Sequence, residues 1–316
     1  MRISRLATSS ALTITGLASA VSAFASNKNG PTDGEIGLQR SVTPVMDSIT
    51  SFNNYWLVPI MTIIVVLVTV LMVIVLIKFR AKSNPEPSKI THNTMLEVVW
   101  TLVPVIILMV MAVPSMKLLY YQDVIPEAGL VVKVTGNTWN WEYAYPDHEN
   151  VDPYISNIVD IPVEEKFGLS HAEIIAKIDA RPASEARLDG RPYLFASDAP
   201  LVVPVDTVVK VLVTSNNNIH AFAVPQFGVK IDAVPGRINE TWFKVHAGEE
   251  GTYYGQCSEI CGVNHSFMPI EVMVVSKAKF ENWVANDGQF SAQYASIQNT
   301  PSTQNITGAV QTVAAK

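Results

Sequence analysis

Two uncharged apolar segments dominate the hydrophobic pattern of the chain, at residues 57–77 and 98–116. A helix needs about 20 apolar residues to cross the hydrocarbon core of a bilayer, and strands of soluble proteins are much shorter. Tyr55 and Trp56 stand at the head of the first segment, where amphipathic rings favour the membrane interface. The pattern therefore predicts two transmembrane helices rather than a buried pair of soluble helices.

A short basic segment at residues 78–96 joins the two spans. Positively charged loops of this kind lie on the cytoplasmic side of a membrane. We therefore expect an antiparallel hairpin over residues 55–117, with both of its ends on the exported side. Pro104 and Pro114 in the second span do not oppose this, because neighbouring helices or water can satisfy the carbonyls that they free. The basic side chains of the first part of the loop are Lys78, Arg80, Lys82 and Lys89.

The first 25 residues have the pattern of a secretory signal peptide. Arg2 and Arg5 are followed by small and apolar residues, and Ala23-Phe24-Ala25 resembles a cleavage site. Cleavage there leaves residues 26–54 as an exported N-terminal segment. The alternative is an uncleaved anchor, which would add a third span.

Residues 118–286 show the alternation and composition of a β-rich exported domain. Many short apolar runs are separated by Pro, Gly and Asn, which predicts an all-β sandwich or barrel but not its strand order. The expected strands cover residues 131–135, 139–145, 201–214, 219–224, 241–245 and 268–275.

The β pattern is interrupted between residues 149 and 198, which we interpret as an insertion. Within it, Ser170 is a suitable N-cap for a short helix that runs to Ala180. A second short amphipathic helix is expected over residues 277–286. Residues 287–316 are rich in Ser, Gln, Thr, Asn and Ala, and they lack the apolar side chains to fold alone, which predicts a disordered tail.

Charge is unevenly distributed along the chain. From Leu118 to the end there are 23 acidic and 13 basic side chains, a net charge of −10 against −6 for the whole chain. An acidic domain attracts a basic soluble partner, although most acidic domains need the charge only for solubility. The acidic surface argues against nucleic acid as a partner.

The candidate chemistry is concentrated between Tyr253 and Met268. This stretch contains Cys257 and Cys261, the only two cysteines of the chain, followed by His265 and Met268. Thiolate and thioether are soft ligands and imidazole is borderline, so this set suits copper better than magnesium or calcium.

A second imidazole is expected from a distant strand, and His220 is the best candidate. A single copper needs only one thiolate. Two thiolates four residues apart could bridge two copper ions, with one histidine for each ion. A plain disulfide between Cys257 and Cys261 remains the alternative, because the domain is expected to be exported.

Three separated motifs resemble one known family. They are Gly255–Pro269, Phe227–Arg237 and Trp139–Tyr143, and together with the two spans they resemble cytochrome c oxidase subunit II over residues 45–285, apart from the insertion. The resemblance implies a cupredoxin-like Greek-key β-sandwich. It also implies a respiratory enzyme subunit that accepts electrons from cytochrome c and passes them to haem in subunit I, where oxygen is reduced to water and protons are translocated.

The resemblance assigns the metal ligands residue by residue. It implies that His220 and His265 are the terminal ligands of a dinuclear copper centre, that Cys257 and Cys261 bridge both ions, and that Met268 is a weak axial ligand.

Further roles are implied for three other residues. The Glu259 backbone carbonyl would bind the second copper, and its side chain would reach a magnesium or manganese ion shared with subunit I. Trp139 would receive the electron, and Glu97, three residues before Trp100, would begin a proton channel. Asn140 departs from the aromatic residue that is usual between the two tryptophans, and this change lies at the implied docking surface.

The implied partners are subunit I and other oxidase subunits, cytochrome c and the membrane. The implied location is a bacterial inner membrane with the copper domain on the periplasmic side. Two alternatives belong to other classes. A quinol oxidase subunit would have lost the copper ligands, and a membrane-tethered copper carrier or chaperone would not need Trp139 and Glu97 together.

Overall fold

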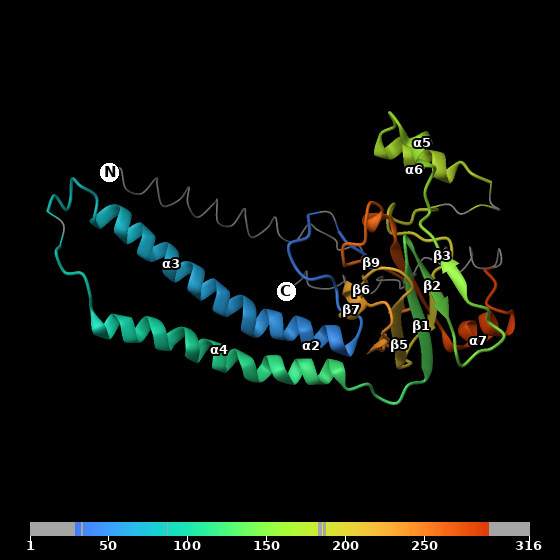
Figure 1. Ribbon diagram of the computed structural model, residues 1–316, viewed down its shortest axis with the longest axis horizontal. Coiled ribbons are helices and arrows are strands. Elements are labelled where there is room, and N and C mark those ends of the chain that lie inside the picture. The colour runs from blue at the N-terminus through green and yellow to red at the C-terminus, as the bar shows by residue number, and fades with distance from the viewer. Residues whose placement is uncertain (1–28, 33, 87, 183–184, 186–187, 291–316) are drawn as a thin grey trace, which may run out of the picture.

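The computed structural model describes residues 29–290, except for 33, 87, 183–184 and 186–187. The predicted signal peptide and almost all of the predicted disordered tail lie outside the described residues. In Figure 1, two long helices run side by side away from a β-rich body, and a small helical lobe stands above that body in this view.

The first long helix is continuous through three segments. It consists of α2 (Pro44–Phe52), a π-helical turn η1 (Asn53–Leu57) and α3 (Val58–Lys78). Thr43 caps it, because its side chain accepts a hydrogen bond from the backbone N–H of Met46. The helix thus begins well before the predicted start of the hairpin at Tyr55.

The second long helix, α4, covers Thr94–Asp123 and is capped by Asn93. Pro104 and Pro114 lie inside it without ending it. No residue of α3 or α4 is buried, and both helices are long and apolar enough to cross a bilayer. The prediction of two spans is confirmed.

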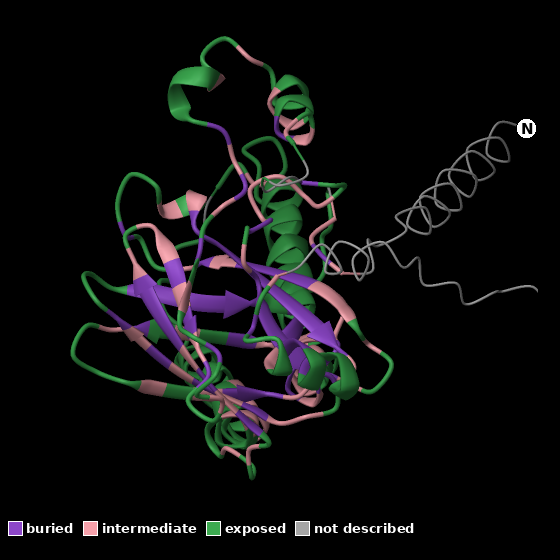
Figure 2. Ribbon diagram, turned by 90° about the vertical axis from the view of Figure 1, so that its right-hand side faces the viewer, coloured by how far each residue is buried: buried purple, intermediate pink, exposed green. Residues whose placement is uncertain are grey.

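The β-rich body is a sandwich of two five-stranded sheets, as the sequence analysis predicted. Figure 2 colours the buried residues of these strands purple. Leu130, Val132 and Val134 alternate along one strand with partly exposed residues and form part of the core. The first sheet has the order β3 (Tyr154–Ser156), β2 (Asn140–Ala144), β1 (Leu130–Asn137), β5 (Val209–Ser215) and β8 (Asn239–Phe243). The second has the order β4 (Leu201–Pro204), β10 (Pro269–Val275), β9 (Gly251–Cys257), β6 (His220–Val224) and β7 (Val229–Ala233).

The expected strand at residues 201–214 is two strands in different sheets. A turn divides β4 from β5 at Asp206, which has a φ of 52°. Strands β3, β7 and β9 were not predicted. In β9, the small and polar residues Gly255 and Gln256 interrupt the apolar run that would mark a strand.

The insertion forms the helical lobe, which contains α5 (Val163–Lys166) and α6 (His171–Asp179) around a small apolar cluster of its own. Ser170 caps α6 in a capping box with Glu173, as predicted in part from the sequence. On the other side of the body, α7 (Lys277–Ala285) confirms the short helix expected there.

The helical hairpin is joined to the sandwich at both of its helix ends. Val42 is fully buried in the sandwich core, and Thr43 Oγ1 donates to the carbonyl of Phe227, the last residue of η2 (Pro225–Phe227), at 2.8 Å. At the end of α4, Trp242 Nε1 donates to the carbonyl of Gln122 at 3.1 Å. The chain segment before α2 is therefore part of the sandwich fold rather than a free extension.

Candidate metal centre

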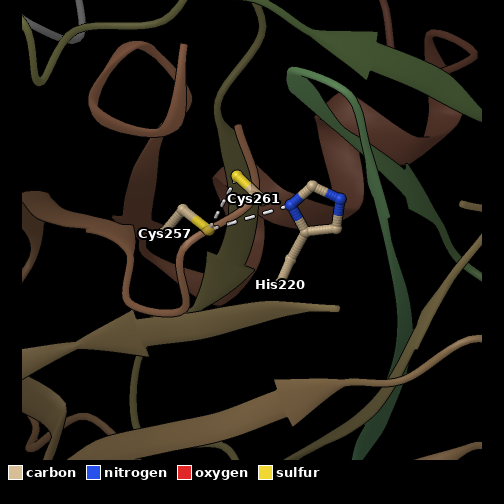
Figure 3. A group of neighbouring side chains, drawn as sticks. All are labelled: His220, Cys257 and Cys261. Carbon is tan, nitrogen blue, oxygen red and sulfur yellow. Dashed lines mark hydrogen bonds between the residues drawn. The ribbon is translucent and has the colours of Figure 1, made fainter. Parts of the chain in front are cut away.

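The predicted ligands come together at one end of the second sheet. Cys257 is the last residue of β9, and the loop after it carries Cys261 and then His265 in a short 3-10 helix, η3 (His265–Phe267). Met268 follows directly before β10. His220 begins β6, which pairs with β9 so that Phe222 lies opposite Cys257. Figure 3 shows His220, Cys257 and Cys261 pointing toward one another.

The donor atoms are in mutual contact. Cys257 Sγ lies 3.8 Å from His220 Nδ1 and 3.8 Å from Cys261 Sγ. Cys261 Sγ lies 3.5 Å from His265 Nδ1 and 3.5 Å from Met268 Sδ. One histidine therefore faces each cysteine, and the thioether stands on the Cys261 side.

Both cysteines are free thiols, so the alternative of a disulfide is not what this structure shows. The backbone carbonyl of Glu259 lies 3.4 Å from Cys257 Sγ, whereas Met268 Sδ contacts the other cysteine. Glu259 is an exposed residue, unlike the buried cysteines on either side of it.

Burial shifts the pKa of two side chains in this cluster. His220, Cys257, Cys261 and Met268 are all buried, and His265 is partly buried. Burial, and then the nearby His265, lowers the pKa of His220. Burial, and then Cys257, raises the pKa of the Cys261 thiol to about 12. Two imidazoles and three closely spaced sulfurs, most of them buried, fit a soft, thiophilic metal such as copper.

Two tryptophans hold the ligand loop from the first sheet. Trp141 is buried in β2, and its Nε1 donates to the carbonyl of Met268 at 3.2 Å. Trp139 Nε1 donates to the carbonyl of Cys261 at 3.1 Å. We expected Trp139 to begin a strand. The structure instead places it in the β1–β2 turn, just before β2 begins at Asn140. Because it is in the turn, it is only partly buried, and it covers the centre from outside.

Gly262 makes the close approach of Trp139 possible. Its φ of 116° is one that side chains disfavour, and a Cβ there would lie 3.1 Å from the Trp139 ring. The ring therefore packs on the backbone immediately after Cys261.

Glu97 is not brought to this cluster. It lies in the first turn of α4, at the end of the hairpin remote from the sandwich (Figure 1). Its position is that expected of a residue at the cytoplasmic end of the second span.

The polar turn that precedes His220 is visible in the sequence, but it was given no role there. Asn217 Oδ1 lies 3.0 Å from His220 Nε2, and Asn218 Nδ2 donates to the carbonyl of Cys261 at 3.0 Å. Three consecutive asparagines, Asn216 to Asn218, one residue away from a candidate ligand were the available signal.

Comparison with known proteins places this architecture in one family. The family model described as cytochrome c oxidase subunit II, periplasmic domain, matches residues 130–275, and the model of its transmembrane domain matches residues 31–118. The first match contains the whole sulfur and imidazole cluster, and the second contains the helical hairpin.

Similar individual proteins agree. A probable cytochrome c oxidase subunit 2 of Rickettsia bellii is 40% identical over 262 residues, which are 83% of this chain and 87% of that protein. Cytochrome c oxidase subunit 2 of Cereibacter sphaeroides is 38% identical over 289 residues, 90% of this chain and 92% of that protein. The crystal structure of the periplasmic domain of subunit II of cytochrome oxidase of Bradyrhizobium japonicum is 40% identical, with a TM-score of 0.40, and covers 52% of this chain and 97% of that domain. This chain belongs to the cytochrome c oxidase subunit II family, with a helical hairpin in the membrane and a periplasmic β-sandwich domain.

Proposed function

We propose that this chain receives electrons from cytochrome c at a dinuclear copper centre and delivers them to haem in subunit I of a respiratory oxidase. The observation that carries the proposal is the pairing of each cysteine sulfur with one histidine Nδ1, at 3.8 Å and 3.5 Å, while the two sulfurs lie 3.8 Å apart. A single copper would need only one of the two thiolates.

The proposed ligands are the members of this cluster. Cys257 and Cys261 would bridge the two ions, with His220 on one and His265 on the other. When bound, two copper ions that share one unpaired electron supply one-electron redox chemistry with little change of structure. Met268 Sδ and the carbonyl of Glu259 would complete the set, one on each side.

The protein supplies a rigid, dry setting for these ligands. Trp141 and Trp139 tie the carbonyls of Met268 and Cys261 to the first sheet, so the loop cannot swing away from His220. Trp139 is also the only one of the two indoles with exposed surface, which makes it the natural contact for the incoming electron donor.

Two acidic residues are proposed to serve the rest of the enzyme. The exposed Glu259 carboxylate would bind a magnesium or manganese ion at the boundary with subunit I. Glu97, at the opposite end of the hairpin, would collect protons at the cytoplasmic surface. Together with the basic loop at residues 78–96, this orientation fits a bacterial inner membrane with the sandwich in the periplasm.

A replacement experiment tests this function against its alternatives. The full chain, or a Cys257→Ser variant, is produced in cells that lack the native gene, and the membranes are solubilised in mild detergent. We expect haem subunits to copurify with the full chain, and cytochrome c oxidation to be lost in the variant. Copper binding without haem subunits would favour a copper carrier. Quinol oxidation that survives in the variant would favour a quinol oxidase subunit.

A further inference from the structure

The orientation of the Asn217 side chain can be derived from its neighbours. Asn217 Oδ1 lies 2.8 Å from the backbone nitrogen of Asn218 and 3.0 Å from His220 Nε2. The backbone N–H of Asn218 can only donate a hydrogen bond. The amide atom that faces it must therefore be the carbonyl oxygen, which has a second lone pair for another donor.

That second donor is His220 Nε2. An oxygen acceptor pairs with a nitrogen that carries hydrogen, so Nε2 is the protonated nitrogen of the ring. A neutral imidazole has one N–H, and its other nitrogen then presents a lone pair. The other nitrogen here is Nδ1, which faces Cys257 Sγ.

We propose that Asn217 is a positioning residue that fixes His220 as the Nε2–H tautomer and so presents Nδ1 to the metal. The identity of the metal rests on the proposed function, but the tautomer does not. A histidine ligand commonly donates its second N–H to a neighbouring acceptor, which fixes the orientation of the ring and increases its basicity.

Close packing on two sides holds the His220 ring in this orientation. A Cβ at Gly136 of β1 would lie 2.9 Å from His220 Cδ2, so the backbone of β1 packs directly on one side of the ring. The Trp141 ring meets it edge to face, with centroids 6.0 Å apart. A flip of the ring would put a carbon atom in place of Nε2 beside Asn217, and another in place of Nδ1 beside Cys257. Both contacts would then be lost.

Asn217 is itself held in place. Its backbone N–H donates to Ser215 Oγ at 3.2 Å, so the turn is ordered before any metal arrives. Asn216, one residue earlier, instead donates its side-chain amide to Asn137 Oδ1 at 2.9 Å and contacts none of the proposed ligands. It is a matched control for the same residue type in the same turn.

The first test is the tautomer of the metal-free protein. The full chain, with 15N-labelled histidine and in detergent, is measured by nitrogen NMR, and the His220 signals among the six histidines are identified by their loss in a His220→Gln variant. We expect the proton on Nε2. A proton on Nδ1 in the unsubstituted chain would overturn the proposal without any variant having to fold.

The second test compares Asn217→Leu, Asn217→Asp and Asn216→Ala by competitive copper titration and the same NMR measurement. Asn217→Leu removes the acceptor, and we expect a mixed tautomer and about 10–100-fold weaker copper binding. Asn217→Asp keeps an oxygen and should keep the Nε2–H tautomer, while Asn216→Ala should match the unsubstituted chain. Unchanged tautomer and affinity in Asn217→Leu would refute the positioning role and leave the copper assignment intact.

Discussion

Arg191 and Glu271 form an ion pair that attaches the insertion to the sandwich. Arg191 Nη1 lies 2.8 Å from Glu271 Oε2, and the same oxygen accepts a hydrogen bond from the backbone N–H of Ser197 at 2.6 Å. The Glu271 side chain has no exposed surface, and that of Arg191 is 12% exposed. The pair thus joins the lobe side of the molecule to the centre of β10.

Removal of Arg191 should be strongly destabilising. Arg191→Met leaves the buried Glu271 carboxylate without its cation, and breaking a buried pair in this way costs about 3–5 kcal/mol. Adding Glu271→Gln should recover part of this loss, because Gln is neutral and still accepts from Ser197. Denaturant unfolding of the full chain in detergent measures both effects. A double variant as unstable as Arg191→Met would show that the charge is not the cause.

Glu271 should also give the stability a distinct pH dependence. Burial raises the pKa of Glu271, although Arg191 opposes the shift. Between the ordinary glutamate pKa, about 4.3, and the raised folded value, the unfolded chain binds fewer protons than the folded chain. The unfolding free energy from this group therefore falls as pH rises through that window.

Glu271→Gln cannot titrate and should lack this contribution. The unfolding free energy of the original chain minus that of the variant is measured from pH 4 to pH 7. We expect the difference to decrease with pH. A difference that increases would mean that Arg191, rather than burial, controls the carboxyl group.

Gly136→Ala should disturb the metal centre without unfolding the sandwich. The new methyl group would lie 2.9 Å from His220 Cδ2 and 3.0 Å from its Cγ, so the ring must shift. We expect copper affinity to fall about tenfold or more, within the range for lost support of a ligand. Gly37→Ala is the control, because its methyl group would meet nothing within 4 Å. Equal copper affinity in both variants would contradict the tight packing around His220.

Trp139→Phe should slow electron uptake and leave copper binding in place. The variant loses one hydrogen bond to the carbonyl of Cys261 but keeps the one from Asn218 Nδ2, the one from Trp141 to Met268 and all of the proposed ligands. We expect cytochrome c oxidation to slow about tenfold or more, which corresponds to about 1.4 kcal/mol in the barrier. Trp242→Phe, which also loses an indole hydrogen bond, should keep the normal rate. Equal rates in the two variants would remove Trp139 from the electron path.

The sequence predicted the hairpin and the grouping of the cysteine, histidine and methionine side chains because both are carried mainly by local patterns. Uncharged runs identify membrane helices without knowledge of the fold. Cys257, Cys261, His265 and Met268 lie within twelve consecutive residues, at the end of β9 and in the loop after it, so their meeting needs no long-range contact. His220 required only the expectation of one ligand from another strand.

Other features depend on contacts that the sequence does not display. Glu271 reads as an acid within an apolar strand, and its partner Arg191 is remote in the chain. Gly136 appears ordinary until β1 is seen to pack on His220.

The start of the first helix, by contrast, had a local signal in the sequence, because Thr43 followed by Pro44 is a common helix start.

The proposed function depends on two copper ions that share one unpaired electron and are held by Cys257 and Cys261. Electron paramagnetic resonance on the copper-loaded full chain can detect this sharing. We expect hyperfine splitting from two equivalent copper nuclei, lost in Cys257→Ser. Splitting from a single nucleus in the unsubstituted chain would contradict it.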